Sequence, residues 1–326
     1  MITRRRLVIA LGAGALTAPI AGYAQPSGKT HRIGYLIDRT GPGGFDQAFL
    51  EGLRALGYVD GRNIHIEYRW AGTSPERLAT MAAELVVLKI DAIVTAGVPA
   101  TMAAKRATAT IPIVMASSPD PVAAGLVASF ARPGGNVTGQ SIFALELSAK
   151  RLEIFKEAIP KLSRVGVLYN AANPAMPPQF RETEGAAKVL GLQVQPMETR
   201  ITDDLETAFA STRKWGAGGV IILSDGSTIS HRSQIAVAAA ANRLPTMFAN
   251  QAYLEGGGLM SYGPNIAEAF RRAATYVDKI LKGTKPGNLP IEQPTKFEFV
   301  INMKTSKALG LKIPDVIMLR ADRVIK

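Results

Sequence analysis

From residue 31 to the end, short apolar runs alternate with longer stretches in which apolar residues recur every three or four positions. Short apolar runs indicate buried strands and the longer spacing indicates amphipathic helices, so the alternation is typical of parallel α/β units. The pattern predicts strands over residues 32–38, 63–70, 92–96, 111–115, 136–141, 164–170, 192–197, 219–224, 244–249, 258–262 and 296–301. It predicts helices over residues 45–56, 74–89, 122–130, 146–159, 180–190, 203–214, 267–281 and 305–309, with others after residue 99 and before residue 242.

The series of strands contains an internal repeat. Residues 164–170 (Arg-Val-Gly-Val-Leu-Tyr-Asn) match residues 32–38 (Arg-Ile-Gly-Tyr-Leu-Ile-Asp) position by position. The strands that follow each copy recur in the same order at similar spacing. We therefore expect an α/β fold with two similar doubly wound parallel-sheet lobes whose loop ends face one cleft. The strict apolar and polar alternation of residues 63–70 predicts a half-buried edge strand.

The repeat also predicts how the lobes are connected. By symmetry, the helix over residues 267–281 returns to the first lobe, so the chain crosses between lobes near Ser141, Gly263 and Gly287. These crossings form a multi-strand hinge. Lobe 1 then comprises residues 30–141 and 264–286, and lobe 2 comprises residues 142–263 and 287–326.

The first 24 residues have the pattern of an export signal. Three consecutive arginines precede a short apolar stretch, and small residues follow as far as Ala24. This order predicts a cleaved signal peptide and a mature protein in the periplasm. The arginines are similar to a twin-arginine signal, with a general secretory signal and an uncleaved membrane anchor as alternatives.

Composition narrows the classes of function. The formal net charge is +12, and removing residues 1–24, with three arginines and no acid, leaves 12 − 3 = +9. The remaining basic residues are spread among acidic ones, which favours a solvated surface over a nucleic-acid groove. No cysteine is present, and the three histidines are isolated in the sequence. We expect no metal and no cofactor.

Polar residues stand where several predicted strands end, which is where open parallel sheets bind ligands. Ser117, Ser118 and Asp120 follow the strand over residues 111–115, and Thr95 and Gly97 close the strand before it. The equivalent strand ends of the second lobe carry Asn170, Asn173, Asp225 and Asn250. The alternative interpretation for each residue is a turn or a helix cap.

Several segments in order resemble one family. They are residues 57–63 (Gly-Tyr-Val-Asp-Gly-Arg-Asn), 117–122 (Ser-Ser-Pro-Asp-Pro-Val), 131–139 (Ala-Arg-Pro-Gly-Gly-Asn-Val-Thr-Gly), 257–263 (Gly-Gly-Leu-Met-Ser-Tyr-Gly) and 293–302 (Gln-Pro-Thr-Lys-Phe-Glu-Phe-Val-Ile-Asn). The chain from residue 32 resembles the extracytoplasmic substrate-binding proteins of ABC transporters related to tryptophan- and tyrosine-binding components. The resemblance implies a type I periplasmic-binding-protein fold that closes on a small ligand.

The resemblance also implies a mechanism and partners. Hinge closure would trap an amino acid or similar solute and deliver it to an ABC permease with its ATPase. Asp120 would pair with an ammonium group. Thr95, Gly97, Ser117 and Ser118 would take a carboxylate through hydroxyls and backbone amides. The protein would be a monomer that meets the membrane only through the permease.

Two other classes of function remain open. An exported hydrolase could use carboxylates such as Asp120 and Asp225 across the cleft, although no nucleophile with a base and an orienting group is present. A ligand-sensing domain of a membrane receptor would have the same fold. A cytoplasmic repressor is disfavoured because the amino terminus resembles an export signal. Residues 41–45 follow the first strand as a nucleotide loop would, but they lack the Walker lysine, which favours a plain turn.

Overall fold

The structure is a computed structural model, and it describes residues 30–72, 74–142, 147–199 and 205–326. The predicted export signal over residues 1–24 lies outside the described residues. The same is true of the predicted helix starts at residues 146 and 203.

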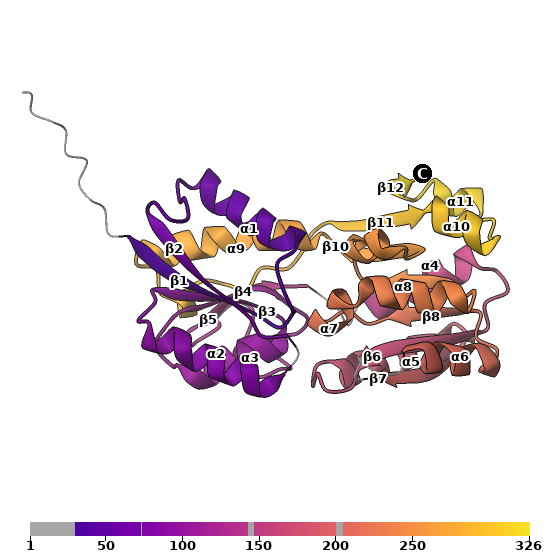
Figure 1. Cartoon of the computed structure of the whole chain (residues 1–326), viewed down its shortest axis with the longest axis horizontal. Coiled ribbons are helices and arrows are strands. Elements are labelled where there is room, and N and C mark those ends of the chain that lie inside the picture. Colours follow the sequence, from indigo (N-terminus) through magenta and orange to yellow (C-terminus); the bar gives the residue numbers. More distant parts are fainter. Residues whose placement is uncertain (1–29, 73, 143–146, 200–204) are drawn as a thin grey trace, which may run out of the picture. The chain divides into compact units, whose positions relative to one another are not determined.

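The described residues form two separate β-sheets (Figure 1). The first sheet is parallel throughout in the order β2-β1-β3-β4-β5, with β1 His31–Ile37, β2 Ile64–Trp70, β3 Ala92–Ala96, β4 Ile113–Ser118 and β5 Val137–Ser141. The second sheet has the order β12-β11-β10-β9-β8-β6-β7, with β6 Arg164–Asn170, β7 Gln193–Thr199, β8 Gly219–Ile222, β9 Thr246–Phe248, β10 Met260–Pro264, β11 Phe297–Asn302 and β12 Arg323–Ile325. In the second sheet, β10 and β11 are antiparallel and the other neighbours are parallel.

Helices cover both faces of each sheet. The helices on the first sheet are α1 Gly44–Ala55, α2 Pro75–Val87, α3 Val98–Ala107 and α9 Ile266–Leu281. The helices on the second sheet are α4 Leu147–Ala158, α5 Met176–Val189, α6 Leu205–Trp215, α7 Gly226–Ser230, α8 Arg232–Ala241, η1 Gln251–Gly256, α10 Met303–Leu309 and α11 Asp315–Met318, and the short helix η2 Pro286–Asn288 contacts β5 of the first sheet. We call the first sheet with its helices the first lobe, and the second sheet with its helices the second lobe. The predicted fold class, two doubly wound α/β lobes, is confirmed.

The core of the first lobe follows from the two-residue period of β1. Ile33, Tyr35 and Ile37 point to one face, where they pack against α1 and α9. Leu36 points to the other face and packs against residues of α2 and α3, including Leu85. Because both faces are covered, the strand is a nearly continuous apolar run, as expected in a parallel sheet.

One predicted helix is wrong. Residues 122–130 form turns rather than a helix, although the run is apolar. The amide of Ala124 donates to the carbonyl of Asp120 in one helical turn, but the amide of Leu126 donates to the carbonyl of Pro121. Gly125 has a φ of +67°, which ends the turn in the left-handed region. Apolar composition alone therefore does not extend a helix through this glycine.

The chain passes between the two sheets three times. It leaves the first sheet after β5 and enters α4, and it returns between Pro264 of β10 and Ile266 of α9. Leu289 and Ile291 are still buried in the cores of the first lobe. The third passage therefore lies between Ile291 and the start of β11 at Phe297.

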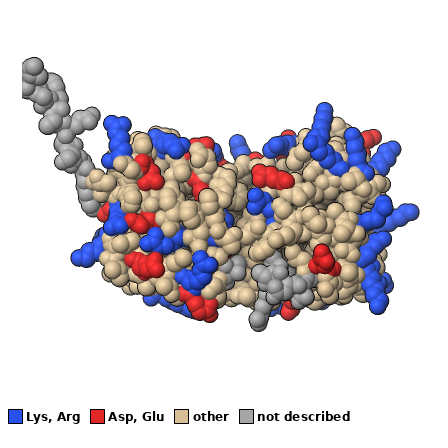
Figure 2. All heavy atoms as spheres, viewed as in Figure 1, with Lys and Arg blue, Asp and Glu red and all other residues tan. Residues whose placement is uncertain are grey.

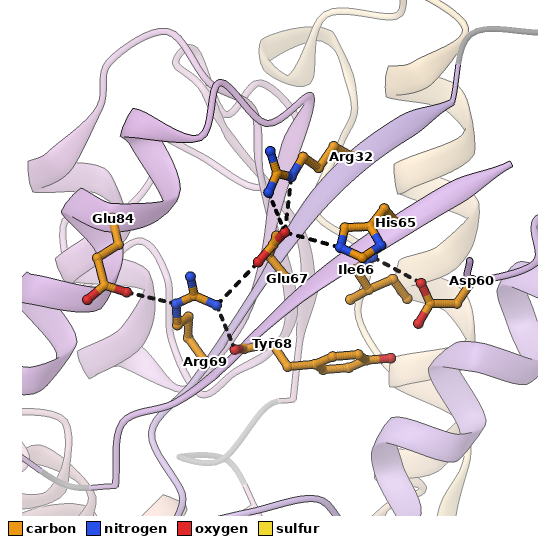
Figure 3. A network of polar contacts seen from close by, with 8 residues as sticks. All are labelled: Arg32, Asp60, His65, Ile66, Glu67, Tyr68, Arg69 and Glu84. Carbon is orange, nitrogen blue, oxygen red and sulfur yellow. Dashed lines mark hydrogen bonds and ion pairs between the residues drawn. The ribbon is translucent and has the colours of Figure 1, made fainter. Parts of the chain in front are cut away.

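The edge strand β2 carries a network of charged side chains (Figure 3). Glu67 accepts hydrogen bonds from Arg32 of β1 at 2.6 and 3.0 Å and from Arg69 at 3.4 Å. Arg69 also donates to Glu84 at 2.9 Å, and His65 lies 3.2 Å from Glu67. Charged side chains along an exposed edge oppose pairing with another strand, so we assign this network to the scaffold.

Surface charge is mixed. On the face drawn in Figure 2, acidic and basic side chains are interspersed over the first lobe, whereas Lys and Arg are more frequent at the outer end of the second lobe. Among the described helices, none has the length and apolar character needed to cross a membrane. Within the same residues, His, Asp and Glu side chains form no cluster of three that could hold a metal ion.

Candidate ligand pocket

The carboxyl ends of strands from both sheets meet at one cavity of about 100 Å³. In the first lobe, its lining follows β1, β3 and β4, and in the second lobe it follows β6, β8, β9 and β10. This is the edge at which open parallel sheets bind ligands. Aromatic side chains form part of the wall, since Phe45 of α1 and Phe270 of α9 line the cavity with stacked rings whose centroids are 5.5 Å apart.

Asp38, directly after β1, is the most perturbed acid of the cavity. Its side chain is buried, and a Cβ added to Gly97 or Gly226 would lie 2.7 or 2.3 Å from its carboxylate oxygens. Gly97 belongs to the first lobe and Gly226 to the second, so the Asp38 carboxylate lies between the two lobes. Burial and the nearby carboxylate of Asp225 raise the pKa of Asp38 from 3.8 to about 7, against the opposing effect of Arg39.

Asp225 is held by several donors. Its Oδ1 accepts from the amide of Thr228 at 2.8 Å and caps α7, which begins at Gly226. Its Oδ2 accepts from the side-chain amides of Asn170 at 2.8 Å and Asn173 at 3.2 Å. Asp225 therefore lines the cavity and also fixes the start of α7 and the strand end of β6.

Two buried arginines line the cavity. Arg39 is an ion-pair partner of Asp46, which also accepts a hydrogen bond from Tyr35. Arg151 of α4 donates from Nε to the carbonyl of Tyr262 at 2.8 Å. Within the described residues, Arg151 forms no ion pair. Burial lowers the pKa of Arg151 to about 10, so the guanidinium still carries its charge at neutral pH.

Five of the nine site residues expected from the sequence line the cavity: Gly97, Ser117, Asn173, Asp225 and Asn250. Asn250 also caps η1 through the amide of Ala252, at 3.1 Å.

Three expected residues lie behind the cavity wall. Thr95 is fully buried and its hydroxyl lies 2.8 Å from that of Thr101. Ser118 is fully buried in β4, and within the described residues its hydroxyl has no hydrogen-bond partner. Asn170 lies one layer back and reaches the cavity only through Asp225.

Asp120 lies in a neighbouring crevice of about 260 Å³ that is lined mainly by apolar side chains and shares Val98, Pro119 and Gln179 with the cavity. Its Oδ1 accepts from the amides of Val122 at 3.1 Å and Ala123 at 3.0 Å. Because turns follow Asp120 and no helix does, its contacts support the interpretation as a turn residue.

The sequence interpretation missed several polar residues of the lining: Asp38, Arg39, Arg151, Gln179 and Ser224. The repeat contained a signal for Asp38, because it occupies the position of Asn170 in the matched strand. Arg151 gave no such signal. It lies on a helix that follows the first lobe, and only the packing of α4 against β10 brings it to the cavity.

Comparisons with known proteins identify the family. The chain is 28% identical over 287 residues to a tyrosine-binding protein of Clostridioides difficile, covering 87% of this chain and 81% of that protein. It is 26% identical to a Streptococcus pneumonia ABC domain solved in complex with L-Trp, with a TM-score of 0.84 over 91% of this chain and 100% of the other.

A second solved structure, a ligand-free, open substrate binding protein with adhesive properties from Clostridium difficile, is also 26% identical. The match covers 91% of this chain and 99% of the chain of that protein, with a TM-score of 0.65. The family model described as ABC transporter substrate binding protein matches residues 42–325. The chain therefore belongs to the ABC transporter substrate binding protein family, as the sequence motifs predicted.

Proposed function

We propose that this protein is the extracytoplasmic solute-binding component of an ABC importer and that it captures an amino acid with an aromatic side chain. The observation that carries the proposal is the cavity between the lobes, which combines buried charges of both signs with an aromatic wall. A zwitterion with an apolar side chain matches that combination. The relatives described as tyrosine-binding and as an L-Trp complex support the same class of ligand.

The arrangement of the two lobes supports capture by closure. At equal sequence identity, the chain is more similar to the L-Trp complex than to the ligand-free, open protein, with TM-scores of 0.84 and 0.65. Three passages of the chain between the sheets supply the hinge. A ligand favours the closed arrangement only by binding it more tightly than the open one, which contacts from both lobes provide.

Asp38 is the proposed partner of the ligand's ammonium group. Its carboxylate is buried beside that of Asp225, and a cation between them would remove their mutual repulsion. Asp120, which the sequence suggested for this role, lies in the neighbouring crevice and caps its own turn. Gly97, Ser117, Asn173 and Asn250 remain candidate contacts in the lining.

The family supports the remaining parts of the proposal. The protein would work as a monomer in the periplasm after removal of residues 1–24. The closed form would deliver its ligand to a permease driven by an ATPase. Catalysis has no role in this mechanism, and no cofactor enters it.

Thermal unfolding of the purified protein with single amino acids tests the proposal. A ligand that binds only the folded state raises the melting temperature, by about 5 °C when it is present at a hundredfold excess over Kd. We expect L-tryptophan or L-tyrosine to produce the shift, and L-glutamate to produce none. Bound amino acid recovered unchanged after denaturation would exclude the hydrolase alternative. The absence of a shift with every aromatic amino acid would contradict the proposed ligand class.

A further inference from the structure

We propose that Arg151 is the receptor for the ligand's carboxylate group. The inference rests on the proposed function and deepens it, because it assigns one charged group of the ligand to one side chain of the pocket. In the closed protein, the terminal nitrogens of the guanidinium would bind the two oxygens of the carboxylate. The ligand class that follows is an α-amino acid with a free carboxylate, in preference to its amide or amine.

Arg151 carries a buried charge that has no counter-charge among the described residues. Arg151 is 3% exposed and lines the cavity, and the described residues place no carboxylate in an ion pair with it. Among the described residues, the hydrogen-bond partner of its side chain is the neutral carbonyl of Tyr262. Removing a charge from water without a partner costs several kcal/mol. A protein retains such a group most readily where another molecule supplies the opposite charge.

The guanidinium of Arg151 is also held in a defined orientation. The bond from Nε to the carbonyl of Tyr262 fixes one edge of the planar group. Gly263 follows directly, and a Cβ there would lie 3.4 Å from Nη2. The guanidinium is thus held against the backbone at the end of β10, while its two terminal nitrogens stay available to bind a ligand. A preorganised fork of this kind suits bidentate binding of a carboxylate.

The other arginine of the cavity is already neutralised. Arg39 pairs with Asp46, and its Nε donates to the carbonyl of Gly41 at 3.2 Å. An anion entering the cavity therefore gains more from Arg151 than from Arg39. With Asp38 in the first lobe and Arg151 in the second, opposite ends of an amino acid would be held by opposite lobes. The two lobes would then close fully only on a ligand that carries both an ammonium and a carboxylate group.

A comparison of two probes on the unmodified protein tests the inference first. L-Tryptophan and L-tryptophanamide differ at the carboxylate and share the ammonium and the indole. We expect titration calorimetry at pH 6 to give a Kd for the amide that is at least about 30-fold weaker, as for loss of a charge-assisted bidentate contact. Equal affinity for the two compounds would overturn the inference and leave the proposed function intact. If neither compound nor any other aromatic amino acid binds, the proposed function itself fails.

Variants then locate the effect at Arg151. In Arg151→Met, L-tryptophan and L-tryptophanamide should bind with affinities within about threefold of each other, and Arg151→Lys should retain part of the preference. The matched control is Lys150→Met, because Lys150 is the preceding residue of α4 and pairs with Glu153 at the surface. The control should keep the full preference. A preference that survives in Arg151→Met would overturn the assignment. If that variant does not fold, Arg151→Lys decides the assignment: an unreduced preference there overturns it.

Discussion

Arg39 and Arg151 are alike in burial and location but differ in their partners. Both line the cavity between the lobes, and their exposed fractions are 7% and 3%. Arg39 in the first lobe is paired with Asp46, whereas Arg151 in the second lobe contacts the neutral carbonyl of Tyr262. A buried charge that already has its counter-charge belongs to the scaffold. A buried charge that lacks one within the described residues is costly, and this is the observation behind the carboxylate site proposed at Arg151.

The largest expected effect separates the two arginines by stability. Arg39→Met leaves the buried carboxylate of Asp46 without its cation and should lower the free energy of unfolding by about 3–5 kcal/mol. Arg151→Met leaves no acid behind, so its unfolding free energy should be unchanged or higher. Urea unfolding of both variants measures the difference. A large loss in Arg151→Met together with a small loss in Arg39→Met would reverse our assignment of the two side chains.

A second prediction uses the buried acid on the opposite wall. The folded-state pKa of Asp38, about 7, is higher than its ordinary value of 3.8. The fold therefore favours the protonated form of Asp38. The contribution of this group to the free energy of unfolding is fully present below pH 4 and is lost as the pH rises towards 7. Asp38→Asn cannot ionise, so its advantage over the unmodified protein should grow across this range to on the order of 3 kcal/mol. Urea unfolding at several pH values checks this, and parallel curves for the two proteins would contradict it.

The smallest expected effect concerns Asp120. Its carboxylate accepts from the amides of Val122 and Ala123, so Asp120→Ala should lower the free energy of unfolding by about 1 kcal/mol, as for loss of a cap. Asp120 lines the neighbouring crevice and not the cavity itself, although the two share part of a wall. Calorimetry should therefore find the affinity for L-tryptophan unchanged within about twofold. A loss of binding in this variant would return Asp120 to the ligand site.

Most of the fold was predictable from the sequence because buried parallel strands are short apolar runs with a characteristic spacing. The match between residues 32–38 and 164–170 indicated two lobes before any contact was known. The predicted helix over residues 122–130 was wrong because hydrophobicity does not reveal the left-handed turn at Gly125. Local backbone conformation outweighed the apolar pattern there.

The candidate site was less predictable than the fold. Strand-end positions gave Gly97, Ser117 and Asp225, since the parallel topology brings strand ends to one edge. Whether a side chain at the end of a strand faces the cavity depends on the local backbone conformation. Ser118 is buried in the protein interior, although the adjacent Ser117 lines the cavity. Arg151 depends on how α4 packs on the second sheet. No spacing in the sequence contains that information.

The closeness of Gly226 to Asp38 would, in the proposed function, couple the charge of a bound ligand to the approach of the two lobes. When α7 of the second lobe lies against Asp38, it brings the carboxylates of Asp38 and Asp225 together, and their repulsion opposes shutting. A positively charged group inserted between them changes that repulsion into attraction. In the proposed function, an unloaded protein would meet an electrostatic barrier to closure above pH 7, where Asp38 is ionised, and a protein holding a cationic group would not.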